Sequence, residues 1–174
     1  MTRIIGIDPG LLHTGWGCVD AAAGVDVQGG RLKYVEHGVI SVPSSLHVAQ
    51  RLKQIYTELS EVINELKPSH IAIEEVFVNR NGESTMKLCM ARGVVMLVPA
   101  IAGVDVFEYG ANCIKKTVTG LGHADKSQVK TMVEYFLPAL KVGDKNVRVR
   151  ADGTDALAIA ICHAQHLVMK TLCA

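Results

Sequence analysis

The stretch RIIGIDPG, residues 3–10, decides how this chain begins to fold. The run Ile-Ile-Gly-Ile leads directly into Asp8, and the Pro-Gly behind it is a strong turn signal. We therefore predict a buried strand that ends at Asp8. In α/β folds, ligand sites form outside the carboxyl ends of central strands. An aspartate there also commonly folds back on its own backbone in a turn, so Asp8 alone supports either role.

The pattern of apolar residues beyond this stretch predicts an α/β fold. We expect strands over 3–8, 14–20, 33–42, 70–77 and 104–110. We expect helices over 46–66, 84–101, 111–120, 126–137 and 152–170. The helix over 46–66 is the clearest, because its apolar residues recur at steps of three and four. Three strands, then alternating helices and strands, predict a mixed five-stranded sheet with three antiparallel strands followed by two parallel ones, flanked by helices, in a single domain over 1–174.

The composition is that of a soluble globular domain, with 49% hydrophobic and 20% charged residues. We expect no signal peptide, and no segment reaches about 18 uncharged apolar residues, so no membrane partner is expected. Five cysteines without a CxxC pair favour reduced thiols and a cytoplasmic location. The net charge of +1 indicates no particular partner. Basic residues nevertheless cluster over 115–116, 126–130 and 141–150.

Two glutamates, Glu74 and Glu75, interrupt the apolar strand predicted over 70–77. Side chains alternate between the two faces of a strand, so these carboxylates point in opposite directions. One can be a solvated surface charge. The other must point inward or to the sheet end, where an unpaired carboxylate is costly and usually has a cation or a metal as partner. The strand pattern alone leaves open which glutamate this is.

Two aspartates open the last predicted helix, in ADGTDALAIAICHA, residues 151–164. With Asp152 as N-cap and Asp155 at the third helical position, they form a variant of the capping box. Their spacing also puts both carboxylates on one helix face, where they could bind metal. The two interpretations are compatible. His163 and His166 share a face of the same helix, but no cysteine or carboxylate has zinc-like spacing to them, so we expect packed or exposed histidines.

Four stretches of the sequence, in order, resemble the RuvC family of bacterial Holliday-junction resolvases, which are ribonuclease H-like nucleases. They are IIGIDPGLLHTGWG, IAIEEVFVNRNGESTMKLCMARGV, VFEYGANCIKKTVTGLGHADKSQV and ADGTDALAIAICH. The resemblance runs from residue 3 to about 166. It implies an endodeoxyribonuclease that resolves four-way junctions by paired symmetric nicks in DNA recombination and repair. The loops over 21–30 and 141–150 depart from the family pattern, which affects substrate-facing detail and not the catalytic acids.

The resemblance also implies roles for individual residues. Its catalytic and metal-binding tetrad falls on Asp8, Glu74, Asp152 and Asp155. Its DNA-binding residues fall on Phe77, Lys115 and Lys126, with the aromatic ring near unpaired bases at the crossover and the lysines near phosphates. The family is homodimeric, with the helix over about 84–100 at the dimer contact. The RuvA and RuvB branch-migration proteins are further expected partners.

Four carboxylates without histidine or cysteine suit Mg²⁺, a hard cation that prefers oxygen ligands, with Mn²⁺ as the alternative. Two ions roughly 4 Å apart would activate water and stabilise the departing 3′ oxygen. We expect Asp8 to bridge both ions and the other three acids to complete their coordination.

Three other functions fit part of the pattern. GIDPGLLHTG resembles the first phosphate loop of actin-like and sugar-kinase-like ATPases, but those proteins need two such lobes and 174 residues supply one. A ribonuclease H-like enzyme acting on RNA would use the same tetrad. A non-catalytic module would bind the junction without hydrolysis.

Overall fold

The structure, a computed structural model, describes residues 1–22, 32–75, 82–142 and 151–172. Its strands are β1 (Thr2–Asp8), β2 (His13–Ala21), β3 (Leu32–Ser41), β4 (His70–Glu74) and β5 (Asp105–Tyr109). Its helices are α1 (Val48–Leu66), α2 (Gly82–Ile101), α3 (Ala111–Thr119), α4 (Lys126–Phe136), α5 (Ala139–Val142) and α6 (Ala151–Leu172). The predicted loops over 21–30 and 141–150 lie mostly outside the described residues, and Phe77 lies wholly outside them.

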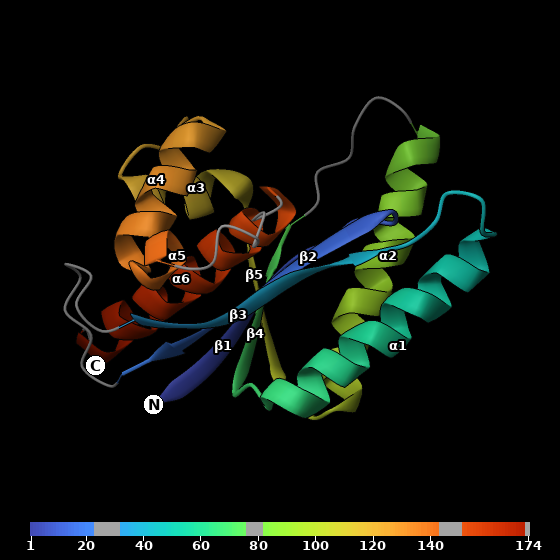
Figure 1. The fold of residues 1–174 in the computed structure, drawn as a ribbon, viewed down its shortest axis with the longest axis horizontal. Coiled ribbons are helices and arrows are strands. Elements are labelled where there is room, and N and C mark those ends of the chain that lie inside the picture. The colour runs from blue at the N-terminus through green and yellow to red at the C-terminus, as the bar shows by residue number, and fades with distance from the viewer. Residues whose placement is uncertain (23–31, 76–81, 143–150, 173–174) are drawn as a thin grey trace.

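The five strands form one mixed sheet in the order β3-β2-β1-β4-β5. β1, β2 and β3 pair antiparallel, whereas β4 pairs parallel with both β1 and β5. Helices α1 and α2 cover one face of the sheet, and α6 lies on the other face beneath α3 and α4 (Figure 1). The predicted fold class is confirmed. The boundaries differ in that β4 ends at Glu74, α6 begins at Ala151, and the short α5 was not predicted.

Side-chain alternation along β1 and β4 divides the interior into two cores. Ile5, Ile7, Ile71 and Ile73 belong to the core under α1 and α2. Ile4 and Ala72 belong to the core under α6, α3 and α4. Because successive residues of a strand face opposite sides, Gly6, Asp8 and Glu74 also belong to the side of α6.

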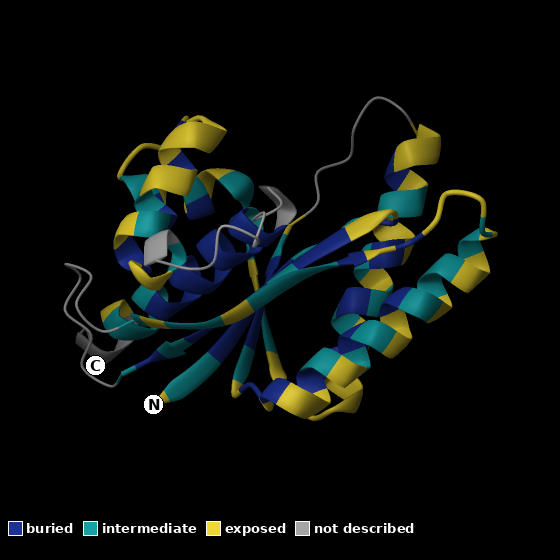
Figure 2. Cartoon of the chain, in the orientation of Figure 1, coloured by how far each residue is buried: buried dark blue, intermediate teal, exposed yellow. Residues whose placement is uncertain are grey.

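Helix α6 is the most deeply buried helix of the fold. Every residue from Ala156 to Cys162 is at most 1% exposed. This helix is apolar on all sides because the sheet covers one of its faces while α3 and α4 cover another. Figure 2 shows the contrast with α1, whose outer side is exposed.

Two glycines let α6 approach the sheet at backbone distance. Gly6 of β1 pairs with Gly17 of β2. A Cβ atom on Gly6 would overlap the Ala156 carbonyl oxygen, and one on Gly17 would lie 2.7 Å from Cγ of Leu157. The absence of side chains at this glycine pair therefore allows α6 to pack closely on the sheet, and it sets the distance between helix and sheet.

Helix α2 is long and apolar enough, by length and composition alone, to cross a membrane, with a mean hydropathy of 1.4 over its most apolar window. It is not uncharged, however: Lys87 and Arg92 lie within it, and Arg92 pairs with Glu108 of β5. Its Ala91, Val95 and Val98 side chains pack in the core. One face of α2 is thus an ordinary core face.

We predict that Gly6→Ala lowers the free energy of unfolding by at least about 2 kcal/mol, because the added methyl group pushes against helix backbone that cannot move aside. The matched control is Gly122→Ala between α3 and α4, where the nearest atom to an added Cβ would be the Asn112 carbonyl oxygen at 3.9 Å. That control should raise the free energy of unfolding by about 0.5 to 1 kcal/mol. Urea denaturation followed by circular dichroism measures both, and equal effects would contradict the proposed close packing.

Candidate active site

The carboxyl ends of β1 and β4 bring two of the predicted acids together. The strands are parallel neighbours, and Ile7 pairs with Ile73 in register. Asp8 and Glu74 are the next residues on each strand, so their side chains leave the same sheet edge on the same face. Glu75 is exposed beyond the strand end, and its N–H donates to the Tyr109 carbonyl oxygen at 2.9 Å. The structure therefore places Glu74, rather than Glu75, toward α6.

A cavity of about 250 Å³ lies at this sheet edge and contains a third acid. Asp155, from the first turns of α6, lines it together with Asp8 and Glu74. Its remaining walls are the apolar or small residues Ala111, Ile114, Val129, Ala158 and Ile159, and the two lysines Lys115 and Lys126. We call this the acidic cavity. It combines three carboxylates and two ammonium groups in one pocket.

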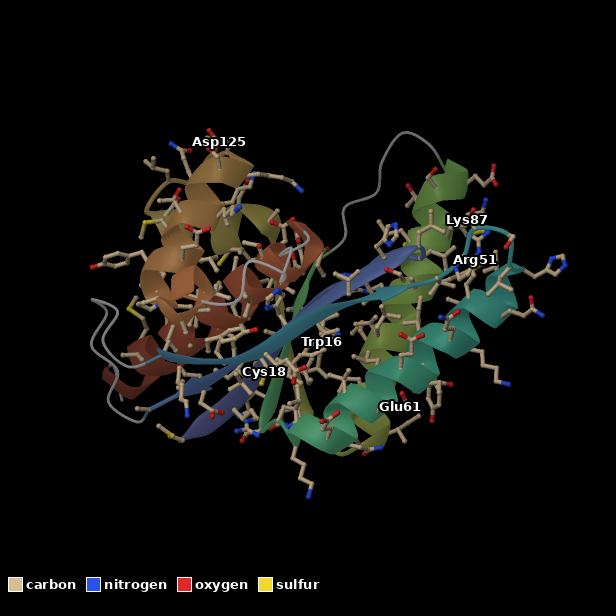
Figure 3. The ribbon with its side chains drawn as sticks, in the orientation of Figure 1. Trp16, Cys18, Arg51, Glu61, Lys87 and Asp125 are labelled. Carbon is tan, nitrogen blue, oxygen red and sulfur yellow. The ribbon has the colours of Figure 1, made fainter. Side chains whose placement is uncertain are left out.

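The two lysines come from the helices that cover α6. Lys126 is the first residue of α4, and its Nζ donates to Oδ2 of Asp155 at 3.1 Å. Asp125 caps this helix: its side chain accepts from the Gln128 N–H at 2.9 Å, and it stands at the exposed end of α4 (Figure 3). The cap fixes where α4 begins and so where Lys126 starts. Because the Lys126 side chain is 80% exposed, the ion pair contributes little to stability.

Glu74 is held in an unfavourable environment for a carboxylate. Burial raises its pKa above the usual range, and the neighbouring charge of Asp155 raises the pKa further. Lys115 and Lys126 act in the opposite direction without cancelling the effect. A cation bound between the acids would relieve both the burial and the repulsion.

The turn behind Asp8 is fixed from within. Thr14 is fully buried, and its hydroxyl donates to the Gly10 carbonyl oxygen at 2.7 Å. The Gly10 N–H points back to the same hydroxyl oxygen at 3.4 Å. This closed turn holds the end of β1, and hence Asp8, in a single position.

The start of α6 is held by residues that no sequence pattern indicated. His37 of β3 packs against Gly153, where a Cβ atom would lie 2.6 Å from the imidazole Cδ2. Tyr34 orients the ring, with its hydroxyl 2.9 Å from Nδ1 of His37. Burial lowers the pKa of His37, which favours the neutral ring. Because β3 and α6 are far apart in the chain, only the fold reveals this contact.

The chemistry of the cavity fits a hard divalent cation. Its acids offer carboxylate oxygens without histidine or cysteine, which is the donor set of Mg²⁺ or Mn²⁺. Within the described residues, no three His, Cys, Asp or Glu side chains already converge closely enough to hold a metal. The fourth predicted acid, Asp152, is in the first turn of α6, but its side chain lies outside the described part.

The structure thus brings five of the seven predicted site residues to one cavity: Asp8, Glu74, Lys115, Lys126 and Asp155. Phe77 and the side chain of Asp152 lie outside the described residues, so their roles stay predictions. The sequence did not indicate the apolar walls from α3, α4 and α6. Their periodicity predicts core packing, and these helices do pack in the core while also lining the cavity.

Comparison with known proteins identifies the group to which this arrangement belongs. The family model for crossover junction endodeoxyribonuclease RuvC matches residues 4–163. The curated RuvC of Gluconacetobacter diazotrophicus is 48% identical, over 95% of this chain and 92% of its own. That of Gluconobacter oxydans is 47% identical with the same coverage.

Solved structures agree with the sequence relatives. Thermus thermophilus RuvC in complex with a Holliday junction substrate superimposes with a TM-score of 0.85 at 31% identity, covering 98% of each chain. The yeast mitochondrial Holliday junction resolvase Ydc2 has a TM-score of 0.64 at 12% identity, which shows a shared fold only. Because the family model matches residues 4–163 of the 174 in this chain and the relatives are close to half identical, the chain belongs to the RuvC family of crossover junction endodeoxyribonucleases.

Proposed function

We propose that this protein resolves four-way DNA junctions by hydrolysing one phosphodiester bond in each of two like strands. The observation that carries this proposal is the acidic cavity, in which Asp8, Glu74 and Asp155 meet Lys115 and Lys126. Acids that can hold a cation, beside lysines that can meet phosphate, are what phosphodiester hydrolysis requires. The related Thermus thermophilus RuvC was solved with a Holliday junction substrate.

Each residue of the cavity has a distinct part in the proposed reaction. Asp8, Glu74 and Asp155, together with Asp152, would hold two Mg²⁺ ions, or Mn²⁺ in their place. When bound, such ions supply a metal-activated water and charge relief at the departing 3′ oxygen. The half-buried position of Glu74 beside Asp155 makes its negative charge unfavourable, and a bound cation would offset this cost.

The lysines would guide the DNA backbone to the acids. Lys126 already reaches the cavity, where its ammonium group pairs with Asp155. A scissile phosphate carries the same negative charge as that carboxylate, so Lys126 can shift from one to the other as substrate and cation enter. Lys115 approaches from α3 on the neighbouring wall. Binding of this kind weakens steeply with salt. We propose that Phe77 stacks on an unpaired base at the crossover.

The alternative functions have less support. Relatives close to half identical are named endodeoxyribonucleases, which disfavours a nuclease specific for RNA and an ATPase. Asp8, Glu74 and Asp155 line one cavity, where they could hold a catalytic cation. This arrangement disfavours a module that only binds the junction.

The protein acts as a homodimer in this proposal, with α2 at the contact. Four large apolar side chains are exposed on this helix: Met86, Met90, Leu97 and Ile101. Their spacing of four, seven and four residues places them along one stripe, opposite the face that packs in the core. A second copy of the chain is the partner we propose for this stripe. A two-fold dimer matches the near two-fold symmetry of a four-way junction, so one active site meets each of two like strands.

We further place the enzyme in the cytoplasm with chromosomal DNA, downstream of branch migration by RuvA and RuvB. The cysteines of the described residues carry free thiols, which suits a reducing compartment.

Asp8→Asn and Glu74→Gln should each lower the rate of junction cleavage by at least about 100-fold, because loss of a ligand exceeds the 10- to 100-fold cost of losing its supporting group. Junction binding should remain within a few-fold. The control Glu75→Gln removes an adjacent exposed carboxylate and should cleave normally. The measurement uses labelled four-way junction, linear duplex and RNA–DNA hybrid with Mg²⁺. Full activity of Asp8→Asn, or preferential cleavage of the hybrid, would contradict the proposed function.

Glu74→Gln should also separate metal binding from folding. A carboxyl group whose pKa is raised in the folded state costs stability as pH rises from its unfolded pKa through its folded pKa. Without metal, the variant should therefore be more stable than the wild type at pH 8 and equally stable at pH 4. Adding Mg²⁺ at pH 8 should raise the thermal midpoint of the wild type and not that of the variant. Equal Mg²⁺ stabilisation of both would remove Glu74 from the metal site.

Leu97→Glu should weaken the dimer by about tenfold or more, because burying one unpaired carboxylate costs more than about 1.4 kcal/mol. Tyr135→Glu is the matched control, since Tyr135 is a comparably exposed apolar residue on α4. Sedimentation equilibrium over a concentration series measures both variants. If the Leu97→Glu protein dimerises as tightly as the wild type, the proposed dimer contact on α2 is wrong.

A further inference from the structure

A second cavity, of about 390 Å³, lies between α3 and α6. Its lining residues are Cys113, Lys116, Thr117, Gln165, His166 and Met169. The α3 residues of this group follow each other at steps of three and one, on a helix face different from that of Ile114 and Lys115, which line the acidic cavity. We call this second pocket the thiol cavity. Its volume is in the range of pockets that bind small molecules.

The thiol cavity contains a cysteine and a histidine in hydrogen-bonding contact. Sγ of Cys113 lies 3.8 Å from Nε2 of His166. The other ring nitrogen, Nδ1, lies 2.9 Å from the Cys162 carbonyl oxygen, which can only accept. Sγ of Cys162 also lies 3.7 Å from Nδ1. The shorter contact with the carbonyl oxygen favours the tautomer that carries its proton on Nδ1, in which Nε2 presents a lone pair to the Cys113 thiol. A nucleophile, a base and a group that orients the base are the parts of an activated thiol.

The imidazole is held in this orientation by its surroundings. The ring of Tyr109 packs on it with centroids 5.0 Å apart. The Tyr109 hydroxyl is itself held 2.7 Å from Nδ1 of His163, which is buried. Cys162 contacts both His166 and Cys113 but is buried, and burial raises the pKa of its thiol to about 12. Cys113, by contrast, is exposed, so it is the thiol of this cluster that an outside reagent can reach.

We propose that the thiol cavity is a site of thiol–disulfide exchange, in which Cys113 takes up half of a small acidic disulfide. Nε2 of His166 accepts the Cys113 proton, and the resulting thiolate attacks one sulfur of the small disulfide. The new bond joins Cys113 to that half as the sulfur–sulfur bond of the reagent breaks. The other half leaves as a thiolate and takes the proton from His166, so atoms and electrons balance. Lys116 supplies the positive charge that would hold a carboxylate of the bound half.

The test compares two thiols in one molecule. In a Cys89→Ser background, Thr57→Cys adds an exposed thiol on α1, where the Thr57 hydroxyl donates to the Lys53 carbonyl oxygen one turn back. The protein is incubated with glutathione disulfide, and peptide mass spectrometry gives the rate at each cysteine. Cys113 should react about tenfold or more faster than the control thiol. Equal rates would overturn the proposal.

Two variants separate the roles of base and charge. His166→Gln should reduce the Cys113 rate toward that of the control thiol for every disulfide. Lys116→Gln should slow only glutathione disulfide and leave the neutral bis(2-hydroxyethyl) disulfide unchanged. A Lys116→Gln protein that keeps its full rate with glutathione disulfide would overturn the preference for an acidic partner. Because Lys116 is exposed, Lys116→Gln is expected to fold. This variant and the internal control thiol therefore test the proposal even if His166→Gln does not fold.

Discussion

The close approach of α6 to the paired glycines Gly6 and Gly17 is the constraint on which the rest of this structure depends. The backbone of α6 meets the strand backbone at Gly6, and the Leu157 side chain and backbone nitrogen lie directly over Gly17. This contact sets how near the first turns of α6 come to the carboxyl ends of β1 and β4. Asp155 reaches the cavity of Asp8 and Glu74 only because the helix lies this low on the sheet. The packing of α6 on the sheet therefore also determines the geometry of the active site.

Electrostatics then determines what the site does. Three carboxylates in one cavity repel each other, and burial makes the charge of Glu74 more costly still. Two ammonium groups partly offset this negative charge: Lys115 from α3 and Lys126 from α4. Lys126 pairs directly with Asp155. The same imbalance favours divalent cations and a phosphate backbone as partners. Binding of those partners would relieve the repulsion and so stabilise the folded protein.

Sequence patterns predicted the sheet and the identity of the acids better than the surroundings of the site. The apolar run before Asp8 predicted the end of β1, and β1 does end there, whereas β4 ends at Glu74, before the predicted strand end at residue 77. The motif resemblance selected Glu74, and side-chain alternation in the structure places that residue toward α6. His166 shows the opposite case: no cysteine or carboxylate had zinc-like spacing to it, yet the structure places Cys113, from a different helix, against its Nε2.

The sequence by itself determined the fold class, the order of the strands along the chain and the acids at their ends, because periodicity, turns and motifs are local properties of a chain. Only the tertiary structure decided which groups meet. His37 against Gly153, Lys126 on Asp155, and Cys113 beside His166 each join segments at least 29 residues apart. Such contacts depend on how closely helices pack on the sheet. Gly6 and Gly17 set that distance, and their role can be recognised only once the structure shows α6 packed against them.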